Sequence, residues 1–435
     1  MTYNRSSTLH LTIEKLVYGG DGLARLPADE HGRGKAAFLP FVLPGEEVDA
    51  ELTEEKPGFV RGRAEQVLKS STHRGEPGCP YFQRCGGCHY QHASYEHQLA
   101  IKAEILRENL RRIAKLELAT ELQVHASPPW EYRNRTRLKI RSVPEFAAGY
   151  YRFGSHDLLP VEKCPISSPL LNRVLAELWH AGRAGQVPAE IEEAEFFANS
   201  DETQFLVELY CRSELPRARA VEIAKRIQLL LSASGVTVFR MAGPGAEPTR
   251  LGSSGADEIT YNVDSKALRV TAGAFFQVNR HLISKLVALA APGRSGRLAL
   301  DLYSGCGLFT ASLAAGFAQV IAVESSQTSY ADLLYNAPPN VKAVRAPVEQ
   351  WLAKTGRISP DFVLVDPPRS GLGEKVVRGL AGLRPPRMTY ISCDPATLAR
   401  DLGGLTKAGY RIEQAHLVDL FPQTYHLESV FSLAR

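Results

Sequence analysis

One cysteine of this 435-residue chain lies where a strand-like run meets the start of a helix, in the segment Tyr390-Ile-Ser-Cys-Asp-Pro-Ala-Thr-Leu-Ala-Arg400. Free N–H groups and the positive dipole end at a helix N-terminus favour the thiolate form of Cys393. Asp394 fits an N-cap and Pro395 the first helical turn, although the charge of Asp394 opposes thiolate formation. A small buried core residue is the alternative, but the rest of the chain favours a nucleophile.

Two carboxylates occur beside apolar runs in the same half of the chain. Glu428 ends the segment His426-Leu-Glu428, just before the apolar run Val430–Leu433. An acid that enters a buried strand is costly to desolvate unless it is paired or functional, although Glu428 taken alone fits a surface position as well. Asp366 follows another apolar run and precedes two prolines that stiffen the loop, so we expect it in a ligand crevice; a helix cap or turn former is the alternative.

A glycine turn follows the first apolar run of this half, in Asp301-Leu-Tyr-Ser-Gly-Cys-Gly307. Gly305 and Gly307 permit a tight turn and close approach of a ligand to the backbone. Thr310 replaces the third glycine of the dinucleotide fingerprint, which argues against NAD. The next run ends at Glu324, whose carboxylate can accept hydrogen bonds from ribose hydroxyls. The pattern favours S-adenosylmethionine (SAM) over a purely structural turn.

Three of the seven cysteines crowd into one loop, Cys79-Pro-Tyr-Phe-Gln-Arg-Cys-Gly-Gly-Cys88. Clustered cysteines in a cytosolic chain indicate a metal rather than disulfides. Cys164, followed by proline, can supply a fourth ligand. Four thiolates suit zinc or an iron–sulfur cluster. The gap of five residues between Cys79 and Cys85 is wider than in zinc knuckles and favours [4Fe–4S], while the pattern differs from that of radical-SAM enzymes.

The patterning divides the chain into three regions. Short alternating strands with glycine turns predict a β-barrel over residues 1–70. Residues 75–265 combine the cysteine loop with a β-rich region and helices. From residue 266 to 435, continuous apolar runs alternate with helix-length segments, which predicts a parallel sheet covered on both faces. Ligands of such sheets bind at the carboxyl ends of the strands, where the candidate residues above lie.

Composition predicts a soluble protein of the cytoplasm. No apolar run approaches the roughly 18 residues needed to span a membrane, and the N-terminus has no stretch resembling a signal peptide. The net charge of +4 is weak support for nucleic acid. Cations alternate along Tyr132–Arg141 and would share one strand face, as a row of phosphate contacts or as a solvated surface: Arg133, Arg135, Arg137, Lys139 and Arg141.

With these residues in view, the chain resembles the RNA 5-methyluridine methyltransferases over nearly its whole length. The cysteine loop with Gln91, His92, Tyr95, Gln98 and Lys102 resembles the iron–sulfur branch that methylates 23S ribosomal RNA, and the N-terminal region resembles the TRAM domain of that branch. Further matches are the segments Tyr132–Arg135, Cys164–Ile166, Phe275–Asn279, Ser392–Asp401 and His426–Glu428.

The resemblance implies an α/β fold: a class I, Rossmann-like methyltransferase domain, an N-terminal TRAM or OB-like barrel and a central α+β iron–sulfur domain. It implies Cys393 as nucleophile and Glu428 as general base. The implied SAM-site residues are Gln277, Tyr303, Gly305, Glu324 and Asp366, and the implied cluster ligands are Cys79, Cys85, Cys88 and Cys164. The helix near residues 95–118 can pack on the catalytic domain, so that boundary is soft. Ser304 and Asp394 depart from the residues common in the family.

These observations predict SAM-dependent methylation of uridine C5 in RNA, most simply 23S rRNA, by a monomer that does not enter membranes. Thiolate addition to C6 would activate C5, and Glu428 would later remove the C5 proton. A transfer RNA methyltransferase would share the catalytic half, whereas the cluster and the barrel favour ribosomal RNA. A 5-methylcytidine enzyme would need a different cysteine arrangement. A non-catalytic iron–sulfur RNA-binding protein would need neither Cys393 nor Glu428.

Overall fold

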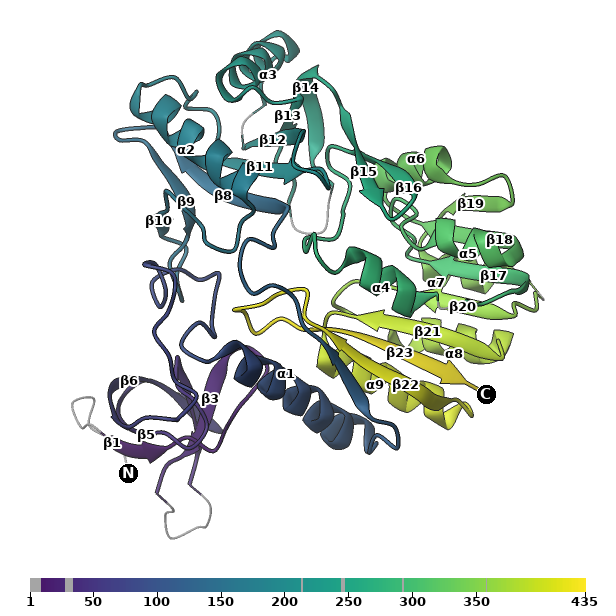
Figure 1. Cartoon of the computed structure of the whole chain (residues 1–435), viewed down its shortest axis with the longest axis horizontal. Helices are drawn as coiled ribbons and strands as arrows, with labels where there is room; N and C mark the ends of the chain where they lie inside the picture. Colours follow the sequence, from purple (N-terminus) through teal and green to yellow (C-terminus); the bar gives the residue numbers. More distant parts are fainter. Residues whose placement is uncertain (1–8, 28–33, 213, 244–246, 292, 357) are drawn as a thin grey trace.

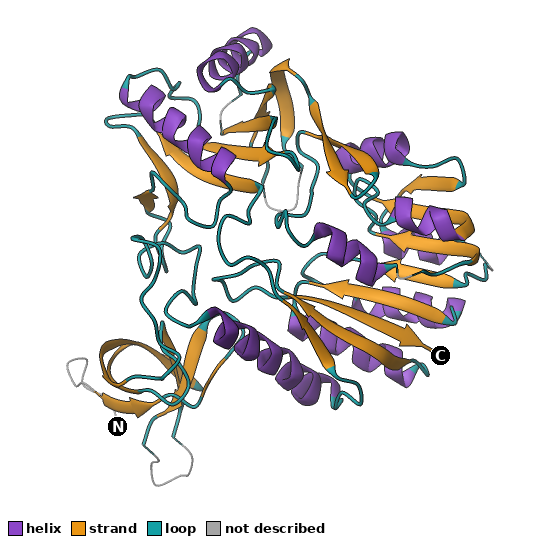
Figure 2. Ribbon diagram, viewed as in Figure 1, coloured by secondary structure: helices purple, strands orange, loops and turns teal. Residues whose placement is uncertain are grey.

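The computed structural model describes residues 9–27, 34–212, 214–243, 247–291, 293–356 and 358–435. Three sheets follow one another along the chain, with a long helix between the first and the last (Figure 1). Helices cover the second and third sheets, whereas the first curls round a core of its own (Figure 2).

The N-terminal sheet has six strands in the order β1-β5-β6-β4-β3-β2. Its core consists of alternate residues such as Leu39 and Val48, which are fully buried, because successive side chains of a strand point to opposite faces. The strands are β1 (Leu9–Thr12), β2 (Lys15–Leu16), β3 (Asp21–Arg25), β4 (Ala36–Pro40), β5 (Glu47–Glu55) and β6 (Phe59–Lys69).

The central sheet has seven strands in the order β10-β9-β8-β11-β12-β13-β14, with α2 (Pro169–Arg183) and α3 (Arg217–Leu231) packed on a shared apolar core. A separate hairpin leads from it toward the third sheet. The strands are β8 (Arg135–Arg141), β9 (Ala147–Tyr151), β10 (Leu158–Pro160), β11 (Glu193–Ala198), β12 (Phe205–Cys211), β13 (Gly235–Arg240) and β14 (Thr249–Gly255), and the hairpin is β15 (Glu258–Val263) with β16 (Lys266–Thr271).

The C-terminal sheet has eight strands in the order β19-β18-β17-β20-β21-β23-β22-β7. The first five of these are mutually parallel, and β23 runs antiparallel to both of its neighbours. The strands are β17 (Gly296–Leu302), β18 (Phe317–Glu324), β19 (Val341–Arg345), β20 (Phe362–Val365), β21 (Arg387–Ser392), β22 (Arg411–Val418), β23 (Glu428–Ala434) and β7 (Leu122–His125). The edge strand β7 therefore comes from residues that the sequence places in the central region.

Helices pack on both faces of this sheet because alternate strand residues are apolar on each side. Ala299 and Leu364 face α4 (Ile283–Ala290) and α5 (Thr310–Gly316) in one core. Leu300 and Val365 face α8 (Gly373–Leu383) and α9 (Pro395–Lys407) in another. The second core also contains Leu106 of α1. The other helices are α1 (Tyr95–Asn109) with its continuation η1 (Leu110–Ala114), α6 (Gln327–Asn336) and α7 (Val348–Lys354).

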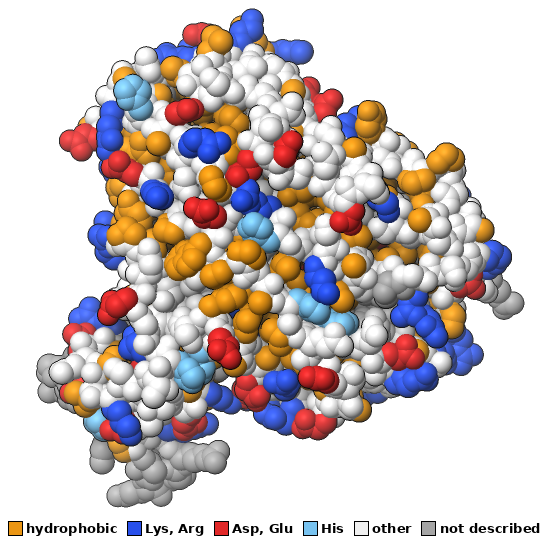
Figure 3. Space-filling model, in the orientation of Figure 1, with side chains coloured by type: hydrophobic (Ala, Val, Ile, Leu, Met, Phe, Trp, Pro, Cys, Tyr) orange, Lys and Arg blue, Asp and Glu red, His pale blue; other side chains and the backbone are white. Residues whose placement is uncertain are grey.

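The row of cations in β8 is neutralised by acids of the neighbouring strands. Arg135 forms ion pairs with Glu195 and with Glu208, the latter at 3.0 Å, while Arg137 and Lys139 both pair with Glu193. The expected row of free phosphate contacts is therefore wrong for these three cations, which stabilise the central sheet instead. On the face shown in Figure 3, basic and acidic side chains are interspersed rather than gathered into one basic field.

None of the helices in the described part of the chain is both long and apolar enough to cross a membrane.

Candidate active site

The predicted catalytic and SAM-site residues gather at the carboxyl edge of the C-terminal sheet. Tyr303 follows β17, Glu324 ends β18, Asp366 follows β20 and Cys393 follows β21. Glu428 begins β23, and because β23 runs antiparallel to β21, its first residue reaches the same edge. Residues that are far apart in the sequence thus meet at the edge where parallel sheets bind ligands.

Cys393 directly follows β21, and Glu428 begins the neighbouring strand β23. In the pairing of β21 with β23, Ser392 lies opposite Ser429, and the Ser429 hydroxyl donates a hydrogen bond to the Ser392 carbonyl at 3.1 Å. Cys393 and Glu428 each lie one residue beyond this last pair, and the Glu428 charge acts on the Cys393 thiol. Opposite residues of antiparallel strands have Cβ atoms about 4.5–5.5 Å apart, so both side chains can reach one small substrate.

The environment of Cys393 keeps its side chain a thiol in the free protein. Burial, followed by the nearby carboxylates of Glu428 and Asp366, raises the pKa of Cys393 to about 12, against an opposing effect of Arg369. Burial and the neighbouring carboxylates therefore outweigh the stabilisation of the thiolate that was expected from the helix N-terminus. The Asp394 carboxylate accepts hydrogen bonds from the first free amides of α9, those of Ala396 and Thr397, at 3.1 and 2.9 Å.

Glu428 is a buried carboxylate with a free oxygen. The residue is 4% exposed, and its Oε1 atom has no hydrogen-bond partner. Burial and the neighbouring Asp366 raise the pKa of Glu428 well above its usual value, with Arg369 acting in the opposite direction. A carboxylate with a raised pKa is a stronger base and suits proton abstraction near neutral pH.

Arg369 is a site residue that the sequence reasoning missed. Its charge acts on both Cys393 and Glu428, and its guanidinium lies 3.4 Å from Nδ1 of His426. Within the segment Val365–Arg369, only Asp366 was predicted to belong to the site. An arginine three residues after an acid at a strand end was the available signal, because a cation there shares the edge of the sheet with the carboxylates.

The glycine turn after β17 is held by the acid that ends β18. The Glu324 carboxylate accepts hydrogen bonds from the amides of Gly305, Ser325 and Ser326 at 2.8, 2.7 and 2.7 Å. Gly305 and Gly307 have φ angles of 55° and 94°, and a Cβ built on Gly305 would meet no atom within 4 Å. The turn therefore leaves open space beside a fixed carboxylate, which fits the adenosine part of SAM.

Two further acids lie beside this turn, Asp301 fully buried and Asp366 partly buried. Burial raises the pKa of Asp301 and of Asp366 to about 7, and the Asp301 charge adds to the rise at Asp366. The Thr310 hydroxyl donates to one Asp301 oxygen, while the other has no partner. Thr310, in the place of the third glycine, thus serves as a donor to a buried acid. Asp301 was not among the predicted site residues, although it opens the glycine segment.

Tyr303 begins the same turn, whereas Gln277 lies in the loop after β16. Gln277 is 7% exposed, and its backbone carbonyl accepts a hydrogen bond from the Asn134 side-chain amide at 3.2 Å. Its neighbour Phe276 packs in one core with Cys306 of the glycine turn. Tyr303 is half-buried with a φ angle of 65°, a left-handed conformation that non-glycine residues adopt mainly where the surroundings enforce it.

Cys79, Cys85, Cys88 and Cys164 line one cavity of about 80 Å³. Burial raises the pKa of Cys85 to about 11 and that of Cys88 to about 12. Arg133 lines the same cavity, and its buried Nε has no partner. Among the described residues, no three His, Cys, Asp or Glu side chains are arranged to hold a single metal ion. Four thiols around a cavity beside a buried cation fit a cluster that carries net negative charge.

Family models match almost the whole chain. The tRNA (Uracil-5-)-methyltransferase model matches residues 94–355 and 354–435, and the TRAM domain model matches residues 4–64. The chain belongs to the RNA uracil-5-methyltransferase family. It carries a TRAM domain at its N-terminus and a class I methyltransferase fold at its C-terminus, and its activity is SAM-dependent RNA uracil-5-methylation.

Two curated members of the family match along nearly their full lengths. The 23S rRNA (uracil(1939)-C(5))-methyltransferase RlmD of Yersinia enterocolitica is 32% identical over 438 residues, which cover 97% of this chain and 94% of that protein. The protein of the same name from Pseudomonas putida is 32% identical over 433 residues, or 97% and 92% of the two chains.

One solved structure shares the fold over the whole chain. The Pyrococcus abyssi tRNA (uracil-54, C5)-methyltransferase in complex with S-adenosyl-L-homocysteine superposes with a TM-score of 0.74, at 23% identity, over 98% of this chain and 100% of that one. The arrangement of the three sheets is therefore that of a known methyltransferase.

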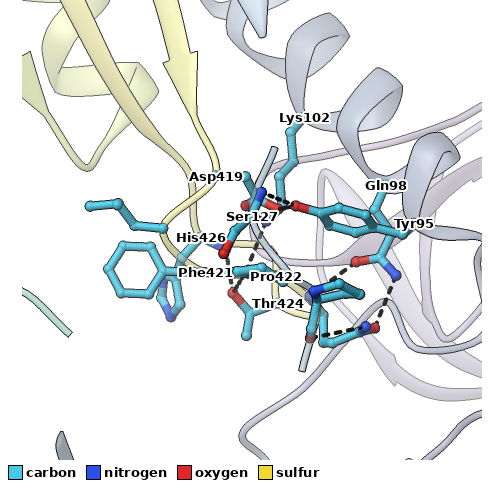
Figure 4. A network of polar contacts seen from close by, with 12 residues as sticks. Tyr95, Gln98, Lys102, Ser127, Asp419, Phe421, Pro422, Thr424 and His426 are labelled. Atoms are coloured by element: carbon cyan, nitrogen blue, oxygen red, sulfur yellow. Dashed lines mark hydrogen bonds and ion pairs between the residues drawn. The ribbon is translucent and has the colours of Figure 1, made fainter. Parts of the chain in front are cut away.

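A polar network of this methyltransferase ties α1 to the loop that precedes Glu428 (Figure 4). The Lys102 ammonium lies 2.6 Å from the Asp419 carboxylate, and both side chains are fully buried. The hydroxyl of Tyr95 donates to Asp419 at 2.9 Å, and the side-chain amide of Gln98 exchanges two hydrogen bonds of 3.0 Å with Gln423. Tyr95, Gln98 and Lys102 share one face of α1, since residues three and four apart are neighbours on a helix.

The same loop is bonded to the cysteine segment. The backbone amides of His89 and Tyr90, which follow Cys88 directly, donate to the Gln423 carbonyl at 2.9 and 3.0 Å. The loop from Asp419 to Leu427 is thus held from two sides, by α1 and by the cysteine segment. These contacts therefore fix the start of β23, where Glu428 lies.

Proposed function

We propose that this methyltransferase acts on a uridine of 23S ribosomal RNA through a covalent bond between the Cys393 sulfur and C6 of the base. The observation that carries the mechanism is the closeness of Cys393 and Glu428: each lies one residue beyond the last pair of β21 with β23, Ser392 with Ser429, and the Glu428 charge acts on the Cys393 thiol. The substrate class is supported by the two RlmD relatives, whose names specify 23S rRNA.

The chemistry requires the cysteine because C5 of uridine is a weak nucleophile. Addition of the Cys393 thiolate to C6 forms a carbon–sulfur bond and moves the electron pair of the C5–C6 double bond to C5 and the O4 carbonyl, as an enolate. SAM supplies an electrophilic methyl group, which C5 acquires. Glu428 then removes the C5 proton, and the electrons of that C–H bond restore the double bond and expel the thiolate.

The charges of the site suit both proton transfers. Cys393 must lose a proton that its surroundings hold tightly. The carboxylate of Asp366, whose charge also acts on the thiol, can accept this proton and leave Glu428 unprotonated for the last step. The raised pKa of Glu428 favours removal of the C5 proton in the last step. The target base must leave its stack to reach this buried edge, and extrusion costs a few kcal/mol.

The four cysteines around the cavity are proposed to hold a [4Fe–4S] cluster. When bound, the group supplies a fixed link between the cysteine segment and Cys164; the proposed methylation requires no electron transfer. Protein purified without oxygen should be brown and contain about four iron and four sulfide ions per chain, as that cluster type requires. Elemental analysis that finds one zinc ion in a colourless protein would contradict this assignment.

The substrate assignment is tested by mapping 5-methyluridine in the RNA of a strain that lacks the gene. We expect one or more uridines of 23S rRNA to lose the modification and to regain it when the gene is restored, while transfer RNA is unaffected. Loss from transfer RNA alone would identify a transfer RNA methyltransferase instead. Failure of the purified protein to transfer labelled methyl groups from SAM to any RNA would leave an RNA-binding protein without catalysis.

A further inference from the structure

The N-terminal sheet places one side chain against the candidate nucleophile. Tyr18 lies between β2 and β3, and its hydroxyl donates a hydrogen bond to the Cys393 carbonyl at 3.2 Å. The two residues are 375 positions apart in the sequence. A residue of the TRAM domain therefore touches the backbone of the residue proposed to attack the base.

The ring of Tyr18 contacts the second catalytic segment as well. It meets the ring of Tyr425 edge to face, with centroids 5.4 Å apart and planes at 88°. Tyr425 lies three residues before Glu428 and contacts His426, with centroids 4.2 Å apart. One side chain thus bridges the loop that carries Cys393 and the loop that leads to Glu428.

The turn that carries Tyr18 is well anchored. The amide of Val17 donates to the Asp21 carbonyl at 2.9 Å, and that of Gly20 donates to the Val17 carbonyl at 3.2 Å. Leu16, two residues before Tyr18, is buried in the core that contains Leu106 of α1. The Tyr18 hydroxyl is therefore held in place by a turn that packs against the catalytic part of the molecule.

The bonded carbonyl belongs to the residue that carries the thiol. It belongs to the peptide that joins Cys393 to Asp394, the N-cap of α9, and the Asp394 amide on the other side of that peptide donates to the Ser392 hydroxyl at 3.3 Å. With both ends of the peptide bonded, its plane cannot turn without losing a hydrogen bond. Burial and the charge of Asp394 raise the pKa of Tyr18 above its usual range, so the hydroxyl remains a donor.

We propose that Tyr18 is a positioning residue for Cys393, so that the TRAM domain completes the catalytic centre in addition to any contact that it makes with RNA. The inference rests on the proposed role of Cys393 in the methylation. It predicts that removal of one hydroxyl from the N-terminal domain slows the chemical step and leaves the binding of RNA unchanged.

The test compares two substitutions of tyrosine by phenylalanine in the full chain. Tyr18→Phe removes the bond to Cys393 and keeps the ring contact with Tyr425. Tyr410→Phe is the matched control, because the Tyr410 hydroxyl also donates to a backbone carbonyl, that of Pro385 at 3.0 Å, next to the opposite end of β21. Each variant is assayed for formation of the covalent RNA adduct in a single turnover and for the KM of the RNA.

We expect Tyr18→Phe to lower the rate of adduct formation about tenfold, the scale of one hydrogen bond, with an unchanged KM for RNA, and Tyr410→Phe to change neither. Tyr18→Ala, which also loses the contact with Tyr425, should be slower still. An unchanged adduct rate in Tyr18→Phe, an equal loss in both phenylalanine variants, or a raised KM at a normal adduct rate would each overturn the proposal.

A second readout does not depend on RNA. Alkylation of Cys393 by iodoacetamide, followed by peptide mass spectrometry, should be faster in Tyr18→Phe than in Tyr410→Phe, because the unbonded turn opens more often. If the unaltered protein forms no RNA adduct while alkylation responds to Tyr18→Phe alone, the proposed function fails and the positioning by Tyr18 stands. Equal alkylation rates in the two variants would contradict the positioning itself.

Discussion

Cys393→Ala is expected to abolish methyl transfer while RNA and SAM still bind. The substitution removes the atom that would bond to C6, and C5 then lacks the electron density to accept a methyl group. Loss of a nucleophile lowers turnover by a factor on the order of 10⁴ or more. The measurement is transfer of labelled methyl groups to RNA, with RNA and SAM affinities determined in parallel.

A buried thiol elsewhere in the chain provides the control. Cys211 lies in the core of the central sheet, away from the carboxyl edge of the catalytic sheet, so Cys211→Ala should retain turnover apart from a modest loss of stability. Substantial turnover by Cys393→Ala would exclude covalent catalysis through this residue. Loss of RNA or SAM binding along with activity would assign Cys393 to binding instead.

Lys102→Met is expected to cost about 3–5 kcal/mol of unfolding free energy, because it leaves the buried Asp419 carboxylate without its cation. Both side chains of this pair are fully buried, and Lys102 also donates to the Phe421 carbonyl at 2.9 Å. Urea unfolding of the purified protein measures the loss. The double variant Lys102→Met, Asp419→Leu should recover much of it, since replacement of both partners removes the isolated charge.

An exposed ion pair is the matched comparison for this loss. Arg378 lies 3.7 Å from Glu374 on α8, with both side chains mostly exposed. Arg378→Met should therefore cost less than about 1 kcal/mol. Similar losses for Lys102→Met and Arg378→Met would show that the α1 network contributes little to holding the loop before Glu428.

The sheet that carries the site could be predicted from the sequence because its strands are continuous apolar runs. The runs at Leu298–Leu302, Phe362–Val365 and Met388–Ser392 are all strands of one sheet. The acids and the thiol that follow them reach one edge for the geometrical reason that parallel strands end on the same side. The antiparallel course of β23, which brings Glu428 to that edge, was not predicted; the role of Glu428 was implied only by the family resemblance.

Other features could not be predicted because they depend on residues that are distant in the sequence. The cations of β8 looked free because Glu193 and Glu195, their partners on β11, lie more than 50 residues away. The strand β7 has no pattern that assigns it to the third sheet; it pairs with β22 across nearly 300 residues. The pKa of Cys393 depends on Glu428 and Asp366, and local helix-terminus reasoning does not include them.

The most direct test of covalent catalysis is a denaturing gel of Glu428→Gln with a uridine-containing RNA fragment and SAM. Glutamine cannot remove the C5 proton, so the reaction should stop after methyl transfer with the RNA still bonded to Cys393, and the protein band should be retarded. The band should be absent from the Cys393→Ala, Glu428→Gln double variant. Normal turnover by Glu428→Gln, or an adduct that persists without Cys393, would contradict the roles proposed for this pair.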